Sequence, residues 1–162
     1  MSRNEVAAAS RQLSDRDRNY LDLYYDEVAM MAKYYAVDPI LIFAVGIESG
    51  FASTGTYLRT GDAFGLTGGS TAHMTTAMSA ADDVRKFFVN YGSQIWGAGS
   101  NVEFFIDALE GAYRREDAEK AERVPGWKEY NSKYPGTWRT MIRGGITTMQ
   151  RDVPIYLQQR GR

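Results

Sequence analysis

The sequence Asp38-Pro-Ile-Leu-Ile-Phe-Ala-Val-Gly-Ile-Glu-Ser-Gly-Phe51 is the most informative part of this chain, because almost every residue before its glutamate is apolar. Pro39 suits the first turn of an α-helix, and Asp38 before it can cap that helix. Gly50 suits the left-handed residue that follows a helix. The stretch therefore predicts a short, buried helix from Pro39 to the serine, with one carboxylate, Glu48, in its last turn.

The position of Glu48 favours a protonated carboxyl group. Burial disfavours the charged form of a carboxylate, and the negative end of the helix dipole does the same. A carboxylic acid that keeps its proton near neutral pH is what a general acid requires. The alternative is that Glu48 lies just past the buried face of the helix and points into water.

The composition is that of one globular domain. Of the 162 residues, 44% are hydrophobic and 24% are charged, which is typical of a folded chain with one core. The formal net charge of −1 gives no reason to expect a nucleic-acid partner or strong attraction to anionic membranes. There is no cysteine and one histidine, His73, which excludes thiolate and multi-histidine metal sites. No apolar run is long enough to predict a membrane span.

The first part of the chain is polar and charged, and it lacks the apolar core of a signal peptide. We expect residues 1–13 to form a flexible segment of a single domain that spans residues 1–162. A helix is expected after Ser14, which can cap it, because apolar residues recur three or four positions apart from Leu21 to Tyr35.

The remaining periodicity is also helical. Ser79, with Asp82 three residues later, resembles a capping box, and Gly92 can end the helix that it opens. Two further helices are expected, one starting near Ser100 or Asn101 and one starting at Thr137 with a break near Gly144-Gly145. The glycine-rich residues 51–76 predict a loop or abbreviated hairpin, and the charge run at residues 114–123 predicts a solvated helical face.

The motif Glu48-Ser-Gly-Phe51, followed by a glycine-rich loop and then Phe64-Gly65-Leu66-Thr-Gly-Gly69, resembles the lysozyme-like enzymes that cleave peptidoglycan. The closest similarity is to the bacterial endo-β-N-acetylglucosaminidase family of flagellar and autolysin muramidases, and the lytic transglycosylases come next. In both families the glutamate of this motif protonates the glycosidic oxygen, and the resemblance implies that role for Glu48. Its stronger part covers residues 38–88, about a third of the chain.

The resemblance implies a mainly α, lysozyme-like helical domain with a reduced β-hairpin or loop lobe. It implies a hydrolase or glycosidase that acts on peptidoglycan glycan strands without a metal or organic cofactor. Ser49 and the loop that begins with Phe64, Gly65 and Leu66 would then line the sugar site. Sugar rings stack their apolar faces on aromatic side chains, so Phe64 and Trp96, both in glycine-rich stretches, are candidates for such contacts; a structural role for both stays open.

A second match lies near the C-terminus. The segment Tyr130-Asn-Ser-Lys-Tyr-Pro-Gly-Thr-Trp138 resembles the Tyr-Ala-Thr-Asp-Pro-x-Tyr segment of the glucosaminidase family, with one residue inserted before its proline. The resemblance implies that Tyr130 lies in the cleft beside the acid, with Tyr134 as the other candidate. The alternative is a turn before a helix that buries its aromatic residues.

The chain departs from the glucosaminidase pattern where that family carries a second acidic residue on a β-hairpin. Residues 68–79 contain no Asp or Glu, although glycoside hydrolysis usually uses two carboxylates. Three solutions are open. Asp62 can supply the second carboxylate, the N-acetyl group of the substrate can act as nucleophile, or Glu48 can serve as both acid and base and form a 1,6-anhydro sugar.

Two functions therefore follow from the sequence. The first is an enzyme, a glycoside hydrolase or lytic transglycosylase, that acts at the bacterial cell wall or periplasm or is carried by a phage. The second is a non-catalytic glycan-binding or structural component of a phage or secretion apparatus on the same fold. The motif around Glu48 favours the enzyme, whereas the missing acidic hairpin and the missing signal peptide favour the second reading.

Overall fold

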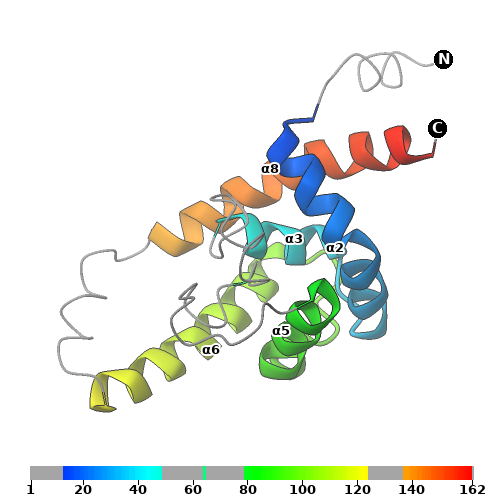
Figure 1. Ribbon diagram of the computed structural model, residues 1–162. Coiled ribbons are helices and arrows are strands. Elements are labelled where there is room, and N and C mark those ends of the chain that lie inside the picture. Colours follow the sequence, from blue (N-terminus) through cyan, green and yellow to red (C-terminus); the bar gives the residue numbers. More distant parts are fainter. Residues whose placement is uncertain (1–12, 49–63, 65–78, 124–136, 162) are drawn as a thin grey trace.

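The computed structural model describes residues 13–48, 64, 79–123 and 137–161, and helices account for most of this part (Figure 1). No strand occurs within these ranges, where the only β-pairing is an isolated bridge between Val37 and Gly99. The prediction of a mainly α fold is therefore confirmed, while the expected hairpin or loop at residues 51–76 lies almost wholly outside the described residues. The helices are α2 (Asp15–Tyr34), α3 (Pro39–Glu48), α5 (Ala80–Ile95), α6 (Val102–Arg123) and α8 (Thr137–Arg160).

Side-chain caps fix where several of these helices begin. The side chains of Ser14, Ser79 and Asn101 each accept a hydrogen bond, at 3.1 Å, from the backbone N–H three residues later. Asp38 accepts one from the N–H of Ile40 at 3.0 Å. These bonds satisfy amide groups that have no partner inside a helix, and each such cap stabilises the fold by about 1 kcal/mol. The predicted helix starts are confirmed.

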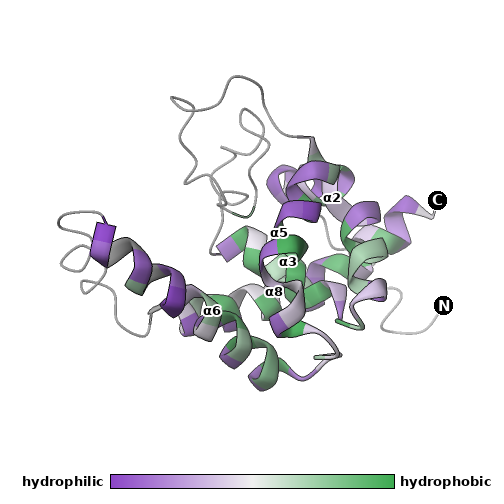
Figure 2. Cartoon of the chain, turned by 90° about the horizontal axis from the view of Figure 1, so that it is seen from below, coloured by the Kyte–Doolittle hydropathy of each residue, from purple (hydrophilic) through white to green (hydrophobic). Residues whose placement is uncertain are grey.

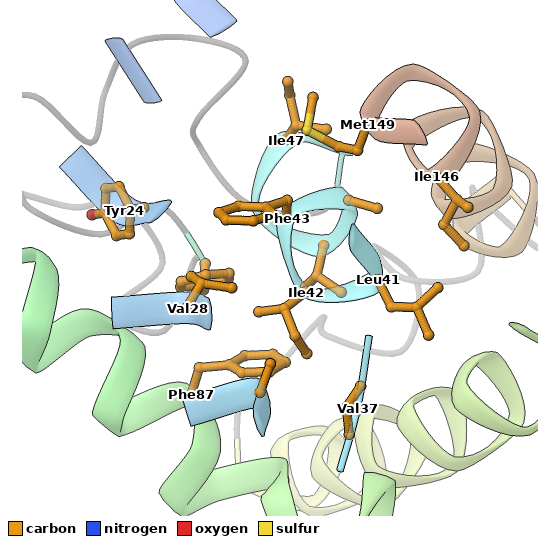
Figure 3. Close-up of a cluster of buried hydrophobic side chains, with 14 of the residues drawn as sticks. Tyr24, Val28, Val37, Leu41, Ile42, Phe43, Ile47, Phe87, Ile146 and Met149 are labelled. Carbon is orange, nitrogen blue, oxygen red and sulfur yellow. The ribbon is translucent and has the colours of Figure 1, made fainter. Parts of the chain in front are cut away.

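Helix α3 is the centre of the core. All seven residues from Leu41 to Ile47 are buried, which explains why the sequence of this helix has no polar face. In Figure 3, Ile146 and Met149 of α8 lie on one side of α3, and Val28 of α2 and Phe87 of α5 lie on another. Full burial of one such side chain is worth about 1.5–3 kcal/mol, so the run of buried residues in this helix contributes strongly to the stability of the core.

Three glycines that we expected to interrupt helices, at two places in the chain, lie inside them. Helix α5 continues past Gly92 to Ile95. The glycine serves close packing there, because a Cβ atom at Gly92 would overlap the ring of Tyr35. Helix α8 likewise runs without a break through Gly144-Gly145. The expected helix end and helix break are both wrong. Leu13, which we placed in a flexible segment, is buried in the core.

Helix α6 carries the charge run on the outside of the molecule. Figure 2 shows a hydrophilic outer half of α6 that extends away from the apolar interior. Arg114, Glu119 and Arg123 are exposed there, which confirms the predicted solvated face. The helix is tied to α5 by a hydrogen bond of 2.8 Å from the Tyr91 hydroxyl to Glu116 Oε2. None of the described helices combines the length and apolarity needed to cross a membrane.

Candidate functional site around Glu48

Glu48 is the last residue of α3, and its side chain is partly buried. Gly145 of α8 lies directly beside it: a Cβ atom at this position would collide with Glu48 Cγ and would lie 3.1 Å from the carbonyl oxygen of Ala44. The absence of a side chain at Gly145 therefore lets the backbone of α8 approach the last turn of α3. This contact supports the methylene groups of Glu48 and leaves its carboxyl group at the end of the buried helix.

Burial raises the pKa of Glu48 above its ordinary value, while the positive charge of Arg16 lowers it by a smaller amount. The direction is the one expected from the sequence, because a carboxylate loses more solvation energy than a neutral carboxyl group when it is buried. Glu48 therefore holds its proton to a higher pH than a solvent-exposed glutamate does. Partial burial also keeps the carboxyl group within reach of a substrate.

Two further carboxyl groups lie close together in the interior, and sequence reasoning missed their pairing. Asp17 on α2 is 3% exposed and Asp152 on α8 is 4% exposed. The two side chains are hydrogen-bonded to each other. Each also has its own arginine, with Arg16 Nε 3.0 Å from Asp17 Oδ1 and Arg151 Nε 2.8 Å from Asp152 Oδ1.

The two aspartates of this pair titrate in opposite directions. Burial and the hydrogen bond with Asp152 raise the pKa of Asp17 to about 6. Burial alone would also raise the pKa of Asp152, but hydrogen bonds with Asp17 and Arg151 outweigh it and hold the pKa below its usual value. Near pH 5, the pair therefore carries one proton, which resides on Asp17, and one negative charge on Asp152.

The aspartate pair lies near Glu48. Gly145 and Asp152 are seven residues apart on α8, which places them on one face of the helix and roughly 10 Å apart. The charge of Arg16 acts on both Glu48 and Asp152, so the start of α2 lies near both. Among the described residues, this region therefore contains three carboxyl groups and two arginines from three helices, but of the carboxyl groups only Glu48 has the exposure needed to touch a substrate.

The raised pKa of Asp17 makes stability depend on pH. Its value is 3.8 ordinarily and about 6 in the folded protein, so the native state binds the extra proton. The associated stability is fully present below pH 3.8 and is lost as the pH rises through about 6. Relative to Asp17→Asn, which has no proton to lose, we expect the parent protein to lose roughly 2 kcal/mol between about pH 4 and pH 7.

Chemical denaturation of both proteins at several pH values measures this difference. Asp15→Asn is the control, because Asp15 lies in the same turn of α2 but is exposed. Parallel stability curves for the parent and Asp17→Asn would show that Asp17 is not the titrating group.

Phe64 is a core residue and does not present its ring to a sugar. It is 4% exposed, and its ring packs edge-to-face on Tyr24 at a centroid distance of 6.0 Å and against Phe87 at 4.9 Å. The prediction that Phe64 stacks on substrate is therefore wrong. Its burial instead anchors the chain beside α3, since a Cβ atom at Gly46 would lie 3.2 Å from the Phe64 ring.

Trp96 is 52% exposed but lies beside the N-terminal end of α3, whereas Glu48 is at the C-terminal end. Its ring contacts Tyr34 and Tyr35 at centroid distances of 5.5 and 4.9 Å, and the next residue donates a hydrogen bond from its N–H to the Tyr35 carbonyl at 2.9 Å. This is the N-terminal end of α3, about 15 Å along the helix from Glu48. The prediction that Trp96 lines the same sugar site as Glu48 is not supported.

The other predicted site residues lie outside the described ranges, and their roles stay predictions: Ser49, Asp62, Gly65, Leu66, Tyr130 and Tyr134. Within the described ranges, no group of three or more Asp, Glu or His side chains is arranged to hold a metal ion.

Comparison of the chain with protein-family models, with curated proteins and with solved structures gave no match. The motif around Glu48, the packing of its side chain and the burial that raises its pKa are therefore the observations from which a function can be proposed.

Proposed function

We propose that this protein cleaves the glycan strands of peptidoglycan, as a glycoside hydrolase or lytic transglycosylase, with Glu48 as the general acid. The observation that carries the proposal is a partly buried carboxyl group at the end of a buried helix, with a pKa raised by that burial. The Glu-Ser-Gly-Phe motif that contains it supports the same assignment. A general acid of this kind typically accelerates a reaction by about 10²–10⁴-fold.

In the proposed reaction, Glu48 donates its proton to the glycosidic oxygen as the bond from that oxygen to the anomeric carbon breaks. The departing sugar leaves as an alcohol, and the resulting Glu48 carboxylate then accepts a proton from the group that attacks the anomeric carbon. Attack by water completes a hydrolysis. Attack by the 6-hydroxyl group of the same sugar gives a 1,6-anhydro product. Both routes regenerate the protonated acid.

The burial of Asp17 and Asp152 excludes these two residues as the second carboxylate that two-carboxylate hydrolysis would need. Side chains that are 3% and 4% exposed cannot reach the anomeric carbon of a bound sugar or hold a water against it. Within the described part of the chain, Glu48 is therefore the one carboxyl group of this cluster that is available for chemistry. The buried pair therefore does not supply the second carboxylate, and three solutions stay open: Asp62, the substrate's N-acetyl group, or transfer to the sugar's own hydroxyl group.

The close packing of Gly145 against Glu48 supports the proposal because a general acid must be held in a fixed direction. Two helices meet at this residue without an intervening side chain, so the acid is supported by backbone and not by a mobile loop. Positioning of a catalytic group on rigid elements lowers the entropy that the reaction step must lose.

Mass spectrometry of purified peptidoglycan after digestion tests the proposal. Soluble fragments identify the bond that is cut, and their ends distinguish reducing sugars from 1,6-anhydro sugars. If the protein binds peptidoglycan but releases no fragment, the non-catalytic role in a phage or secretion apparatus replaces the enzyme.

Asp62→Asn separates the single-acid reaction from hydrolysis by two carboxylates. Asp62 follows Gly61 in a glycine-rich stretch, where an aspartate is by default a turn residue, so we expect the rate of fragment release to fall less than about tenfold, well below the typical contribution of a general acid. A loss as large as that of the Glu48→Gln variant would make Asp62 the second catalytic carboxylate.

A further inference from the structure

Two exposed aromatic side chains touch each other at the end of the molecule where α2 ends and α5 ends. Tyr34, the last residue of α2, is 68% exposed, and Trp96, directly after α5, is 52% exposed. Their ring centroids lie 5.5 Å apart with the ring planes at 77°. We call this pair the aromatic platform. Adjoining exposed apolar groups of this size commonly mark a binding site.

The ring of Tyr35 supports the aromatic platform from the core side. It contacts the rings of Tyr34 and Trp96 at centroid distances of 5.2 and 4.9 Å, and it stacks on the buried ring of Phe88 at 4.8 Å. Gly92 makes room for Tyr35, since a Cβ atom there would overlap its ring. The platform rings are therefore held in place before a ligand arrives, so little side-chain entropy is lost on binding.

Backbone hydrogen bonds join the two segments that carry the aromatic platform. The N–H of Gly97 donates to the Tyr35 carbonyl at 2.9 Å, and the N–H of Asp38 donates to the Gly99 carbonyl at 3.0 Å. Gly97 has φ +75°, and apart from its chain neighbours a Cβ atom there would meet no atom of the described residues within 4 Å. The space beside Trp96 is therefore open to a ligand on this side.

Hydrogen-bonding groups adjoin the aromatic platform. The exposed hydroxyl of Ser100 donates to Asp38 Oδ2 at 3.2 Å. Asp38 is three residues beyond Tyr35, so their Cα atoms are at most about 11 Å apart. Hydroxyl and carboxylate groups can bond the hydroxyl groups of a sugar. Exposed rings beside such groups suit a saccharide, which has apolar C–H faces and hydroxyl edges.

We propose that the aromatic platform is a second glycan-binding site, about 15 Å along α3 from Glu48, which takes uncharged N-acetylated sugar rings by stacking. Two aromatic side chains offer at most about 500 Å². This is less than the roughly 800 Å² per partner of a stable protein interface, but enough for one or two sugar rings. That the glycan is peptidoglycan rests on the proposed function, whereas the stacking of sugars on the platform does not.

A binding site separate from the acid suits an insoluble polymer. Once the aromatic platform holds one part of a glycan strand, the rest of the polymer stays at a high effective concentration near Glu48. The platform would thus keep the protein on its substrate between cleavage events. It takes no part in breaking the bond.

Co-sedimentation with purified, insoluble peptidoglycan tests the proposal, with the full chain carrying Glu48→Gln as the parent so that the polymer is not cut. Trp96→Leu keeps an apolar side chain without a planar ring, and Tyr34→Ala removes the other ring. Each should raise the apparent Kd about tenfold or more, as truncation of an aromatic anchor commonly does. Trp96→Phe keeps a ring and should bind nearly as tightly as the parent.

Leu23→Ala is the control for non-specific apolar adhesion. Leu23 is 50% exposed on the same helix as Tyr34 but lies about 16 Å along α2 from it, so this variant should bind like the parent. Equal weakening in Leu23→Ala would overturn the proposal. Thermal melting shows which variants are folded, and Tyr34→Ala, at the more exposed ring, keeps the test decisive if a Trp96 variant does not fold.

Vesicles that contain phosphatidylglycerol test whether the exposed rings serve a membrane instead. We expect no binding that depends on Trp96, and vesicle binding that is lost in Trp96→Leu would overturn the assignment to a glycan.

Release of glycan fragments by the chain with its native Glu48 tests the proposed function separately. Peptidoglycan binding that depends on the aromatic platform, without any release, would support the platform and remove the enzyme. Glu48-dependent release, with binding absent or unchanged in both Trp96→Leu and Tyr34→Ala, would overturn the platform and leave the proposed function standing.

Discussion

Glu48→Gln is expected to reduce the rate of peptidoglycan cleavage by about a hundredfold or more, because glutamine keeps the shape of the side chain and removes the proton that it transfers. The substitution should have little effect on stability. Glu48 is only partly buried, its ionised form is disfavoured by that burial, and a neutral amide avoids this penalty. The measurement is the initial rate of release of soluble glycan fragments, normalised to folded protein.

The matched control for this variant is Glu103→Gln on α6. Glu103 is exposed and pairs with Arg143 at 2.7 Å, far along the chain from the α3 terminus. Its substitution makes the same chemical change, from a carboxyl group to an amide, at an exposed position and should leave the cleavage rate unchanged. A Glu48→Gln variant as active as this control would remove Glu48 from the reaction.

Gly145→Ala is expected to reduce cleavage on a similar scale, about a hundredfold, by displacing the acid without changing it. The added methyl group would collide with Glu48 Cγ and would press against the carbonyl oxygen of Ala44 at 3.1 Å. Glu48 must then move by about 1 Å, and a displacement of this size at a reacting group can lower a rate about a hundredfold. The backbone contact adds strain, and we expect the free energy of unfolding to fall by about 1–2 kcal/mol.

The neighbouring glycine provides the control on the same helix. A Cβ atom at Gly144 has no neighbouring atom within 4 Å, so Gly144→Ala should raise stability slightly, by up to about 1 kcal/mol, through its better helix propensity. Cleavage should be unaffected. If Gly144→Ala and Gly145→Ala had equal activity, the contact between Gly145 and Glu48 would have no role in positioning the acid.

The parts of the fold that depend on local sequence could be predicted from it. The buried helix α3 follows from its uninterrupted apolar residues, and the helix starts follow from Ser14, Ser79 and Asn101, whose side chains bond amides three residues away. In each case the residues that determine the structure are neighbours along the chain. The direction of the pKa shift of Glu48 was also expected, because an apolar helix predicts burial of its last residue, and burial is the cause of the shift.

The parts that depend on contacts between distant segments could not be predicted. A glycine ends a helix in some contexts and permits close packing in others, and only the approach of Tyr35 to Gly92 or of Glu48 to Gly145 distinguishes the two. The hydrogen bond between Asp17 and Asp152 joins residues on two helices at opposite ends of the sequence. No periodicity in one segment can indicate such a pair.

The predicted roles of the two candidate aromatic residues also depended on contacts between distant segments and were not supported. Phe64 and Trp96 were chosen because they lie in glycine-rich stretches, and sequence position does not reveal which ring becomes buried. Phe64 packs into the core between α2 and α5, and Trp96 lies at the opposite end of α3 from the acid. The length of α3 therefore separates Trp96 from Glu48, although the sequence alone placed both residues in one site.

The central claim is that Glu48 delivers the proton that breaks the glycosidic bond. The most direct test compares the midpoint of the Glu48 carboxyl titration, observed by NMR in the parent protein, with the midpoint of the alkaline limb of the cleavage rate. Our account predicts that both midpoints lie above the ordinary glutamate value and that they coincide. A Glu48 that titrates at or below the ordinary value, or a rate profile that falls at a different pH, would contradict it.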